Sequence, residues 1–238
     1  MKDIQKIIRF DYLTAKPLGL PSFLVVAVMC FGLSLFFAPL ICAYIIFGAM
    51  VFVIPLQGMA DKNGFNKLYG ILPVKRKNIT RARFIYIFLI HFIAEITEII
   101  LALISINLKL YRILPNQDSE MLQMIKDSFE DNHLTFTVIV GMFAFFCFCF
   151  LYMEMMGQIF GRENEMKIIT ISIGVFVGLI AGFLWLSEHG IIPIFMLPSM
   201  PSSVSGKIIL AAVINIISFL TSIIFGEITA NKVSKREL

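Results

Sequence analysis

The sequence predicts an all-α polytopic membrane protein, with six transmembrane helices and an N-terminal interfacial helix in one domain over residues 1–238. The first observation is composition, because 58% of the 238 residues are hydrophobic and only 15% are charged. A soluble domain carries about 25% charged residues, and its surface grows too fast with size to hide so much apolar area. Disordered chains have the opposite composition. The other two observations are long charge-free runs and an uneven distribution of Lys and Arg.

Residues 1–20 combine apolar and basic side chains at helical spacing. Ile4, Ile7, Ile8 and Tyr12 fall on one side, and Lys and Arg residues surround them. This pattern is typical of an amphipathic helix that lies in the membrane interface. The stretch is too long and too acidic for the start of a cleavable signal peptide.

The apolar runs set the six spans. Residues 21–57 carry no charge, and the Ala38-Pro39 step divides them into spans at 21–37 and 40–57, with Pro39 starting the second helix. The remaining spans are expected at Phe84–Leu108, Leu134–Gln158, Ile168–Ser187 and Ile208–Thr229. Each is close to the 20 or so residues that cross the hydrocarbon core.

The connections between spans predict the orientation. The inner segments would be 1–20, 58–83, 159–167 and the tail from 230, and together they hold 16 of the 20 Lys and Arg residues. The outer segments would be an acidic loop at 109–133 and a proline-broken piece at 188–206, which suits an interfacial or re-entrant stretch. Such an imbalance predicts that both termini lie inside. Topology and anionic lipid account for the net charge of +4, so no nucleic-acid partner is expected.

Polar side chains form one stripe in the third span. His91, Glu95, Glu98, Ala102 and Ser105 follow the spacing i, i+4, i+7, i+11 and i+14, which places them on one helix face. Charges at mid-bilayer are costly, so this face is expected to meet protein or water and not lipid. Two carboxylates one turn apart disfavour each other's ionisation, so at least one should be protonated at neutral pH.

Two interpretations of the stripe stay open. It could line a translocation path or a subunit interface, or it could be a hydrogen-bonded structural contact between helices. Glu154 and Glu227 lie near the inner ends of their spans, where they can reach the interface or pair with basic residues.

The sequence offers no catalytic residue and no metal site. It contains no Walker A, dinucleotide-binding, GxSxG or HExxH motif. The four cysteines lie inside apolar runs, where they are expected to act as small hydrophobic residues. An enzyme is therefore not expected, and no cofactor is expected in this chain.

The inner loop at 58–83 is the most informative stretch. Residues 59–69 predict a short helix with an apolar ridge, which Gly70 ends. A Leu72-Pro73 break and the basic cluster Lys75-Arg76-Lys77 follow, and Asn78 is a candidate cap for the third span. A polar helix with an apolar ridge at the inner face is typical of a segment that docks into another protein's groove. An ordinary basic loop is the alternative.

This order of features resembles the permease subunits of ABC-2-type bacterial ABC transporters. The similarity is greatest to the small branch that includes phenol-soluble modulin exporters and bacteriocin-immunity permeases. It is carried by the inner helix, by Leu72-Pro73-Val74-Lys75-Arg76 and by the aromatic start of the third span at Phe84. By this resemblance the inner loop holds a coupling helix that docks into a separate ATPase. The coupling residues would be Asp61, Lys62, Phe65, Asn66, Lys67, Leu68, Tyr69, Leu72, Pro73 and Arg76.

The resemblance implies a multi-pass permease in the bacterial cell membrane. It would work as a homodimer with two copies of an ATP-binding subunit, which would bind ATP and Mg²⁺. The cargo would be an amphipathic or hydrophobic peptide or antimicrobial agent, moved outward. Two alternatives remain: a self-contained secondary transporter or channel that uses Glu95 and Glu98, and a non-transporting membrane immunity or scaffold protein.

Overall fold

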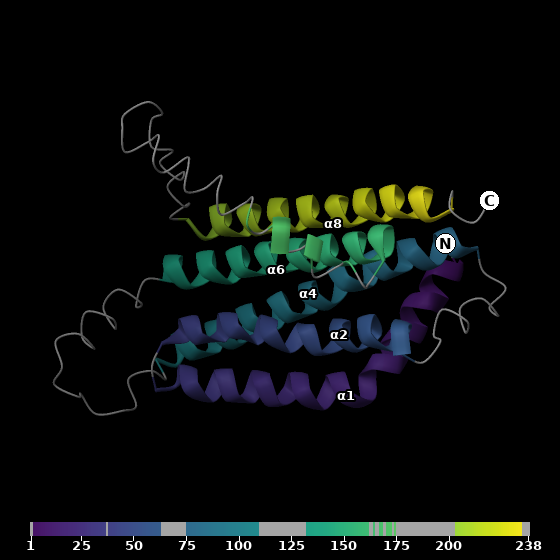
Figure 1. Ribbon diagram of the computed structural model, residues 1–238. Helices are drawn as coiled ribbons and strands as arrows, with labels where there is room; N and C mark the ends of the chain where they lie inside the picture. Colours follow the sequence, from purple (N-terminus) through teal and green to yellow (C-terminus); the bar gives the residue numbers. More distant parts are fainter. Residues whose placement is uncertain are drawn as a thin grey trace.

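The chain forms a bundle of long helices that lie side by side (Figure 1). The computed structural model describes residues 2–36, 38–62, 75–109, 132–161, 164, 167, 168, 170–172, 174 and 203–234. Within these residues every regular element is helical: α1 (Lys2–Ser34), η1 (Pro39–Ile45), α2 (Ile46–Lys62), α4 (Arg76–Asn107), α6 (Asn132–Phe160) and α8 (Val204–Ser234). Five stretches are long and apolar enough to cross a membrane. The chain is thus a membrane-embedded all-α protein.

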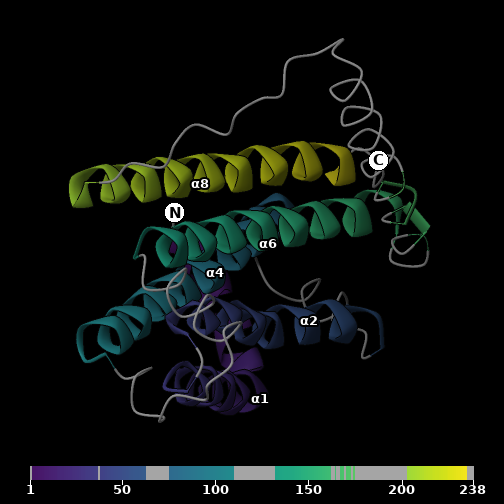
Figure 2. The same ribbon diagram turned by 90° about the vertical axis from the view of Figure 1, so that its left-hand side faces the viewer.

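The helix α4 lies at the centre of the bundle. It contacts α1, η1, α2, α6 and α8, and Figure 2 shows α1 and α8 at opposite edges of the bundle. Its aromatic side chains fill two cores. Tyr86 packs with Phe52 of α2, while Phe84 and Phe88 pack with Phe143 of α6.

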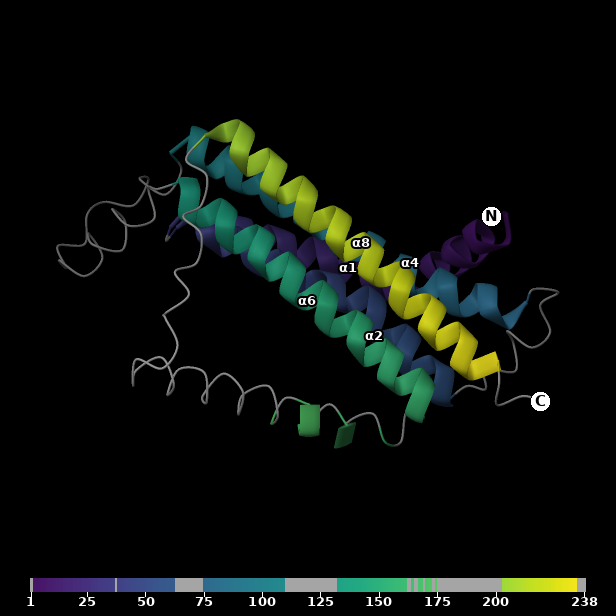
Figure 3. The ribbon, with the colours of Figure 1, turned by 90° about the horizontal axis from the view of Figure 1, so that it is seen from above.

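The N-terminal helix is continuous with the first span. We expected a helix boundary near residue 20, but α1 runs unbroken from Lys2 to Ser34 and includes Pro17 and Pro21. Proline bends a helix because its ring displaces one hydrogen bond, and Figures 1 and 3 show the N-terminal part of α1 turned away from the rest. In that part Ile7 packs against Ala82 of α4.

The break before the second span is confirmed, but its first turns differ from expectation. Ala38 is extended, with φ −161° and ψ 147°, and Pro39 lies in the first turn, as the residue before a proline favours. Residues Pro39–Ile45 form a 3₁₀ helix, which becomes the α-helix α2 at Ile46. The aromatic ring of Phe52 in α2 packs directly against Gly19 in α1. A Cβ atom on Gly19 would lie only 2.7 Å from the Cδ1 of Phe52, so this close approach of α1 and α2 requires glycine.

Most helices are longer than the predicted spans. α2 continues to Lys62, so residues 59–62, which we expected to begin a separate inner helix at 59–69, belong to α2. α4 begins at Arg76, so residues 76–83 are helical and do not belong to a loop. The prediction that Asn78 caps this helix is wrong, because Lys75 occupies the N-cap position.

The predicted spans at 134–158 and 208–229 are confirmed as helices with extended ends. Gly161, with φ +87°, follows the end of α6, where the left-handed conformation favours glycine. Ser203 caps α8 by accepting a hydrogen bond from the N–H of Gly206 at 3.1 Å. The outer loop at 109–133, most of the fifth span at 168–187 and the piece at 188–206 lie largely outside the described residues.

Candidate functional site

The predicted stripe on α4 is buried along its whole length. The exposed fractions are 0% for His91, 1% for Glu95, 0% for Glu98, 3% for Ala102 and 0% for Ser105. The prediction that this face avoids lipid is therefore confirmed. Because the burial arises within one chain, these side chains are enclosed by their own helices.

The Glu98 carboxyl group faces α1, η1 and the start of α2. The backbone N–H of Ile46 lies on that side of the carboxyl group but donates to the carbonyl oxygen of Tyr44, and neither Oε atom of Glu98 has a hydrogen-bond partner among the described residues. The thiols of Cys30 (α1) and Cys42 (η1) lie close to it. A neutral acid tolerates such surroundings far better than a carboxylate.

Glu95 faces α6 and α8. The side chain of Asn215, from α8, is within reach of its carboxyl group, and Cys147, from α6, lies nearby. The Nδ2 of Asn215 also donates to the carbonyl oxygen of Ala211 at 2.9 Å. Glu95 therefore has a side-chain amide from another helix as its neighbour, whereas the neighbours of Glu98 are two thiols and a backbone N–H.

His91 completes the group one turn closer to the N-terminus of α4. Its Nδ1 lies 2.8 Å from the carbonyl oxygen of Ile87, and this oxygen can only accept, so Nδ1 carries a hydrogen. Its Nε2 is buried without a hydrogen-bond partner in the described part of the chain. The ring packs 5.2 Å from that of Phe150, measured between centroids.

The C-terminal end of the stripe is closed by a contact between hydroxyl groups. The Oγ of Ser34, at the end of α1, lies 3.3 Å from the Oγ of Ser105. The hydroxyl group of Ser34 donates its one hydrogen to the carbonyl oxygen of Phe31 at 2.7 Å, so toward Ser105 it can only accept. This pair of serines joins α1 to α4 on the C-terminal side of Glu95 and Glu98.

Toward the N-terminal end of α4, ion pairs connect its second and third turns to α6 and α8. Arg83 lies 3.6 Å from Glu154, which also accepts a hydrogen bond from Gln158 at 2.6 Å. Arg81 contacts Glu227 through two N···O distances of 2.7 and 2.8 Å. The pairing expected for Glu154 and Glu227 is therefore confirmed.

The candidate coupling residues are only partly covered by the structure. Asp61 and Lys62 form the last residues of α2, and Arg76 is the first residue of α4. The others lie outside the described residues: Phe65, Asn66, Lys67, Leu68, Tyr69, Leu72 and Pro73.

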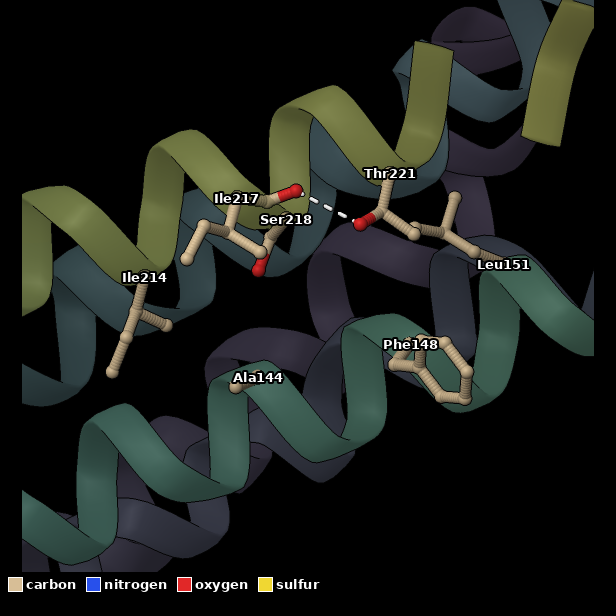
Figure 4. A pocket seen from close by; sticks show the side chains of 7 residues that line it. All are labelled: Ala144, Phe148, Leu151, Ile214, Ile217, Ser218 and Thr221. Carbon is tan, nitrogen blue, oxygen red and sulfur yellow. Dashed lines mark hydrogen bonds between the residues drawn. The ribbon is translucent and has the colours of Figure 1, made fainter. Parts of the chain in front are cut away.

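An apolar groove runs between α6 and α8, with a volume of about 220 Å³. Figure 4 shows Phe148 and Leu151 on one wall and Ile214 and Ile217 on the other. The hydroxyl group of Thr221 donates to the carbonyl oxygen of Ile217 at 2.9 Å, so its hydrogen is not free to donate to a ligand. The side chains that line the groove are mainly apolar, as on a surface that faces lipid.

Sequence reasoning missed three contributors to the site. Asn215 is a lone amide in the middle of an apolar run, and that isolation was the available signal. Cys42 and Cys30 were interpreted only as small hydrophobic residues, although they border Glu98. Within the described residues no three His, Cys, Asp or Glu side chains come together as a metal site.

Comparison with protein-family models, curated proteins and solved structures finds no match to this chain.

Proposed function

We propose that the chain is the membrane-spanning permease subunit of an ATP-driven exporter that works as a homodimer with two copies of a separate ATPase. One observation carries this proposal. The end of α2 and the start of α4 lie at the same end of the bundle as both chain termini (Figure 1). The candidate coupling element, residues 59–72, begins in the last turn of α2 and continues along the sequence between these two helix ends.

The course of the helices supports six spans with both termini inside. α6 and α8 lie side by side and run in the same direction (Figures 1 and 3). The chain therefore leaves α6 at one end of the bundle and enters α8 at the other. We infer that residues 162–202 contain one further crossing, for which the apolar run at 168–187 is the candidate.

The inner ends of the helices suit a transmission role. The basic cluster Lys75-Arg76-Lys77 directly follows the candidate coupling segment, and Arg81 and Arg83 pair with α8 and α6. A displacement of the segment would reach α4 first. The ion pairs would then carry it into two further helices.

The cargo class follows from the family resemblance: amphipathic or hydrophobic peptides, or antimicrobial agents, moved outward across a bacterial cell membrane. The chain itself would bind no nucleotide, and ATP and Mg²⁺ would be held by the partner subunit.

The experiment that tests this proposal is co-purification with an ATPase encoded beside the gene. In a pull-down, Leu68→Asp should abolish association, because the charge would have to be buried unpaired in the partner's groove. Asn164→Asp adds the same charge to an exposed polar position outside the candidate coupling residues, and it serves as the matched control. Equal association of wild type and Leu68→Asp would reject residues 59–72 as the coupling element.

A second candidate is a self-contained transporter, which the burial of Glu95 and Glu98 favours. Transport by the purified chain in vesicles, without ATP or a partner, would favour it over the ATP-driven permease.

A further inference from the structure

Among the described residues, the neighbours of the three titratable side chains in the middle of α4 carry no positive charge. Every helix packed on α4 contributes a neighbour to Glu95, Glu98 or His91, and each neighbour is uncharged or acidic. They are Cys30 of α1, Cys42 of η1, the N–H of Ile46 in α2, Cys147 and Phe150 of α6, and Asn215 of α8.

The sequence excludes a counter-charge from elsewhere at this depth. No Lys or Arg occurs in any of the six apolar runs, 21–37, 40–57, 84–108, 134–158, 168–187 and 208–229. The nearest basic residue along α4 is Arg83, which is about 18 Å from Glu95 at 1.5 Å per residue and is paired with Glu154. Only His91 could offset a negative charge, and its Nε2 has no hydrogen-bond partner in the described residues.

An ionised carboxylate buried without a counter-charge is very unfavourable, whereas a carboxylic acid is tolerated. A metal ion would need several oxygen ligands around it, and the described residues gather no such group. A proton needs one carboxyl oxygen only. The surroundings therefore select a proton as the ligand of these side chains.

We propose that Glu95, Glu98 and His91 form a proton-binding site inside the helix bundle, with Glu98 protonated at neutral pH and Glu95 as the group that exchanges its proton. The assignment follows from their neighbours. Glu98 is fully buried and neither of its oxygens is hydrogen-bonded among the described residues. Glu95 has the Asn215 amide within reach, and an amide N–H can stabilise the carboxylate after the proton leaves.

The position of Glu98 gives the site a structural consequence. Its carboxyl group faces Ile46, where the 3₁₀ helix η1 becomes the α-helix α2. A carboxylate at this point would compete with the carbonyl oxygen of Tyr44 for the Ile46 N–H, since charge-assisted hydrogen bonds are shorter and stronger than neutral ones. α2 then leads to the candidate coupling segment. Ionisation of Glu98 would thus make the transport cycle depend on pH. This effect on transport rests on the proposed permease function, whereas the proton-binding site itself does not.

Infrared spectroscopy of the full chain in lipid nanodiscs tests the site directly. At neutral pH the wild type should show the C=O stretching band of a buried carboxylic acid, and Glu98→Gln should lose it. Glu154→Gln is the matched control and should keep the band, because Glu154 is paired with Arg83 and ionised. Absence of the band in the wild type, or its survival in both Glu98→Gln and Glu95→Gln, would overturn the proposal.

A second measurement needs no variant and covers the case in which Glu98→Gln does not fold. The wild-type chain is treated with dicyclohexylcarbodiimide, a hydrophobic reagent that modifies protonated carboxyl groups, and the adducts are located by mass spectrometry. Adducts should form on Glu95 or Glu98 and decrease as the pH rises, whereas Glu154 and Glu227 should stay unmodified. Protection by Na⁺ or K⁺ at constant pH, with no carboxylic acid band, would identify a cation site and refute the proton site.

These results are independent of the proposed function. If the infrared band is found and no ATPase associates, the proton site stands and the ATP-driven permease fails. If an ATPase associates and the band is absent, the reverse holds.

Discussion

At the scale of single residues, the four glutamates in the helices divide into two kinds. Glu154 and Glu227 have arginine partners on α4, while Glu95 and Glu98 have none within their spans. The two ion pairs also differ from each other in burial. Glu154 is fully buried, whereas the side chain of Glu227 is 43% exposed. The two Arg–Glu ion pairs should therefore contribute unequally to the free energy of unfolding.

Glu154→Ala should destabilise the folded chain by about 3–5 kcal/mol, because it leaves Arg83 without its partner in a buried place. Glu227→Ala is the matched control, and it should cost no more than about 1 kcal/mol, as exposed pairs do. Unfolding in detergent by denaturant measures both. Equal losses in the two variants would contradict the difference in burial.

Glu95→Gln and Glu98→Gln should keep the fold, because Gln preserves the shape and most hydrogen bonding of Glu. If the stripe serves transport, both variants should transport less cargo or should show a shifted pH dependence, since an ionisable group has been removed. A vesicle export assay at several pH values measures this. Normal transport with an unchanged pH profile in both would assign the stripe to packing alone.

The sequence sufficed to predict the burial of the stripe, because period and polarity place all five residues on one face of a single helix. It did not predict what lies opposite. Asn215 follows Glu95 by 120 residues, and only the packing of α8 on α4 brings the two together. Contacts between distant helices leave no periodic signal in one sequence.

At the scale of elements, α8 approaches α4 along small side chains. Ser218, Ser222, Gly226 and Ala230 recur every fourth residue, and Ser222 and Ala230 are at most 1% exposed. A Cβ on Gly226 would lie 3.5 Å from the Cβ of Phe84. Small residues allow helices in membranes to pack closely, where the lipid supplies little hydrophobic drive.

Substitutions at Gly226 should show how tight this contact is. Gly226→Ala should be tolerated, because its new Cβ meets Phe84 at an ordinary distance. Gly226→Leu should cost about 1–3 kcal/mol of stability, as overpacked side chains do. Ala212→Leu, on the exposed face of α8, is the control and should be neutral. Thermal unfolding in detergent measures all three, and a stable Gly226→Leu variant would argue against a close contact.

The helix ends were the least predictable part of the fold. Hydropathy locates the apolar centre of a span but not the polar turns that continue it. α4 starts at Arg76 and α8 continues to Ser234, and contacts across the bundle support these turns: Arg81 with Glu227 and Lys77 with Asn231. The change in composition near residue 20 likewise predicted a boundary, yet α1 continues through it with Pro17 and Pro21 inside the helix.

At the scale of the whole molecule, accessibility of introduced cysteines tests the six-span topology. In intact cells an impermeant thiol reagent should label Glu120→Cys and Ser202→Cys from outside, because both would lie in outer connections. Ser234→Cys, at the inner end of α8, should react only after the cells are opened. Labelling of Glu120→Cys and Ser202→Cys from opposite sides would exclude a crossing between α6 and α8.

The purified chain should hydrolyse no ATP, because its sequence lacks a loop that cradles phosphate groups. Activity should appear only when the partner ATPase is added, and a phosphate-release assay measures both conditions. Robust hydrolysis by the chain alone would reject the division of labour between permease and ATPase.

The central place of α4 has a consequence for the biogenesis of the protein. On its own in lipid, this helix would expose His91, Glu95 and Glu98 to hydrocarbon, and each charge at the bilayer centre costs about 2.5–3.5 kcal/mol on the insertion scale. α1, η1 and α2 are synthesised earlier, and they supply Cys30, Cys42 and Ile46 around Glu98. During translation α4 should therefore wait at the translocon and enter the bilayer against helices that are already there. Because α1, η1 and α2 are made first, the polar face of α4 can pack against protein as soon as it leaves the translocon.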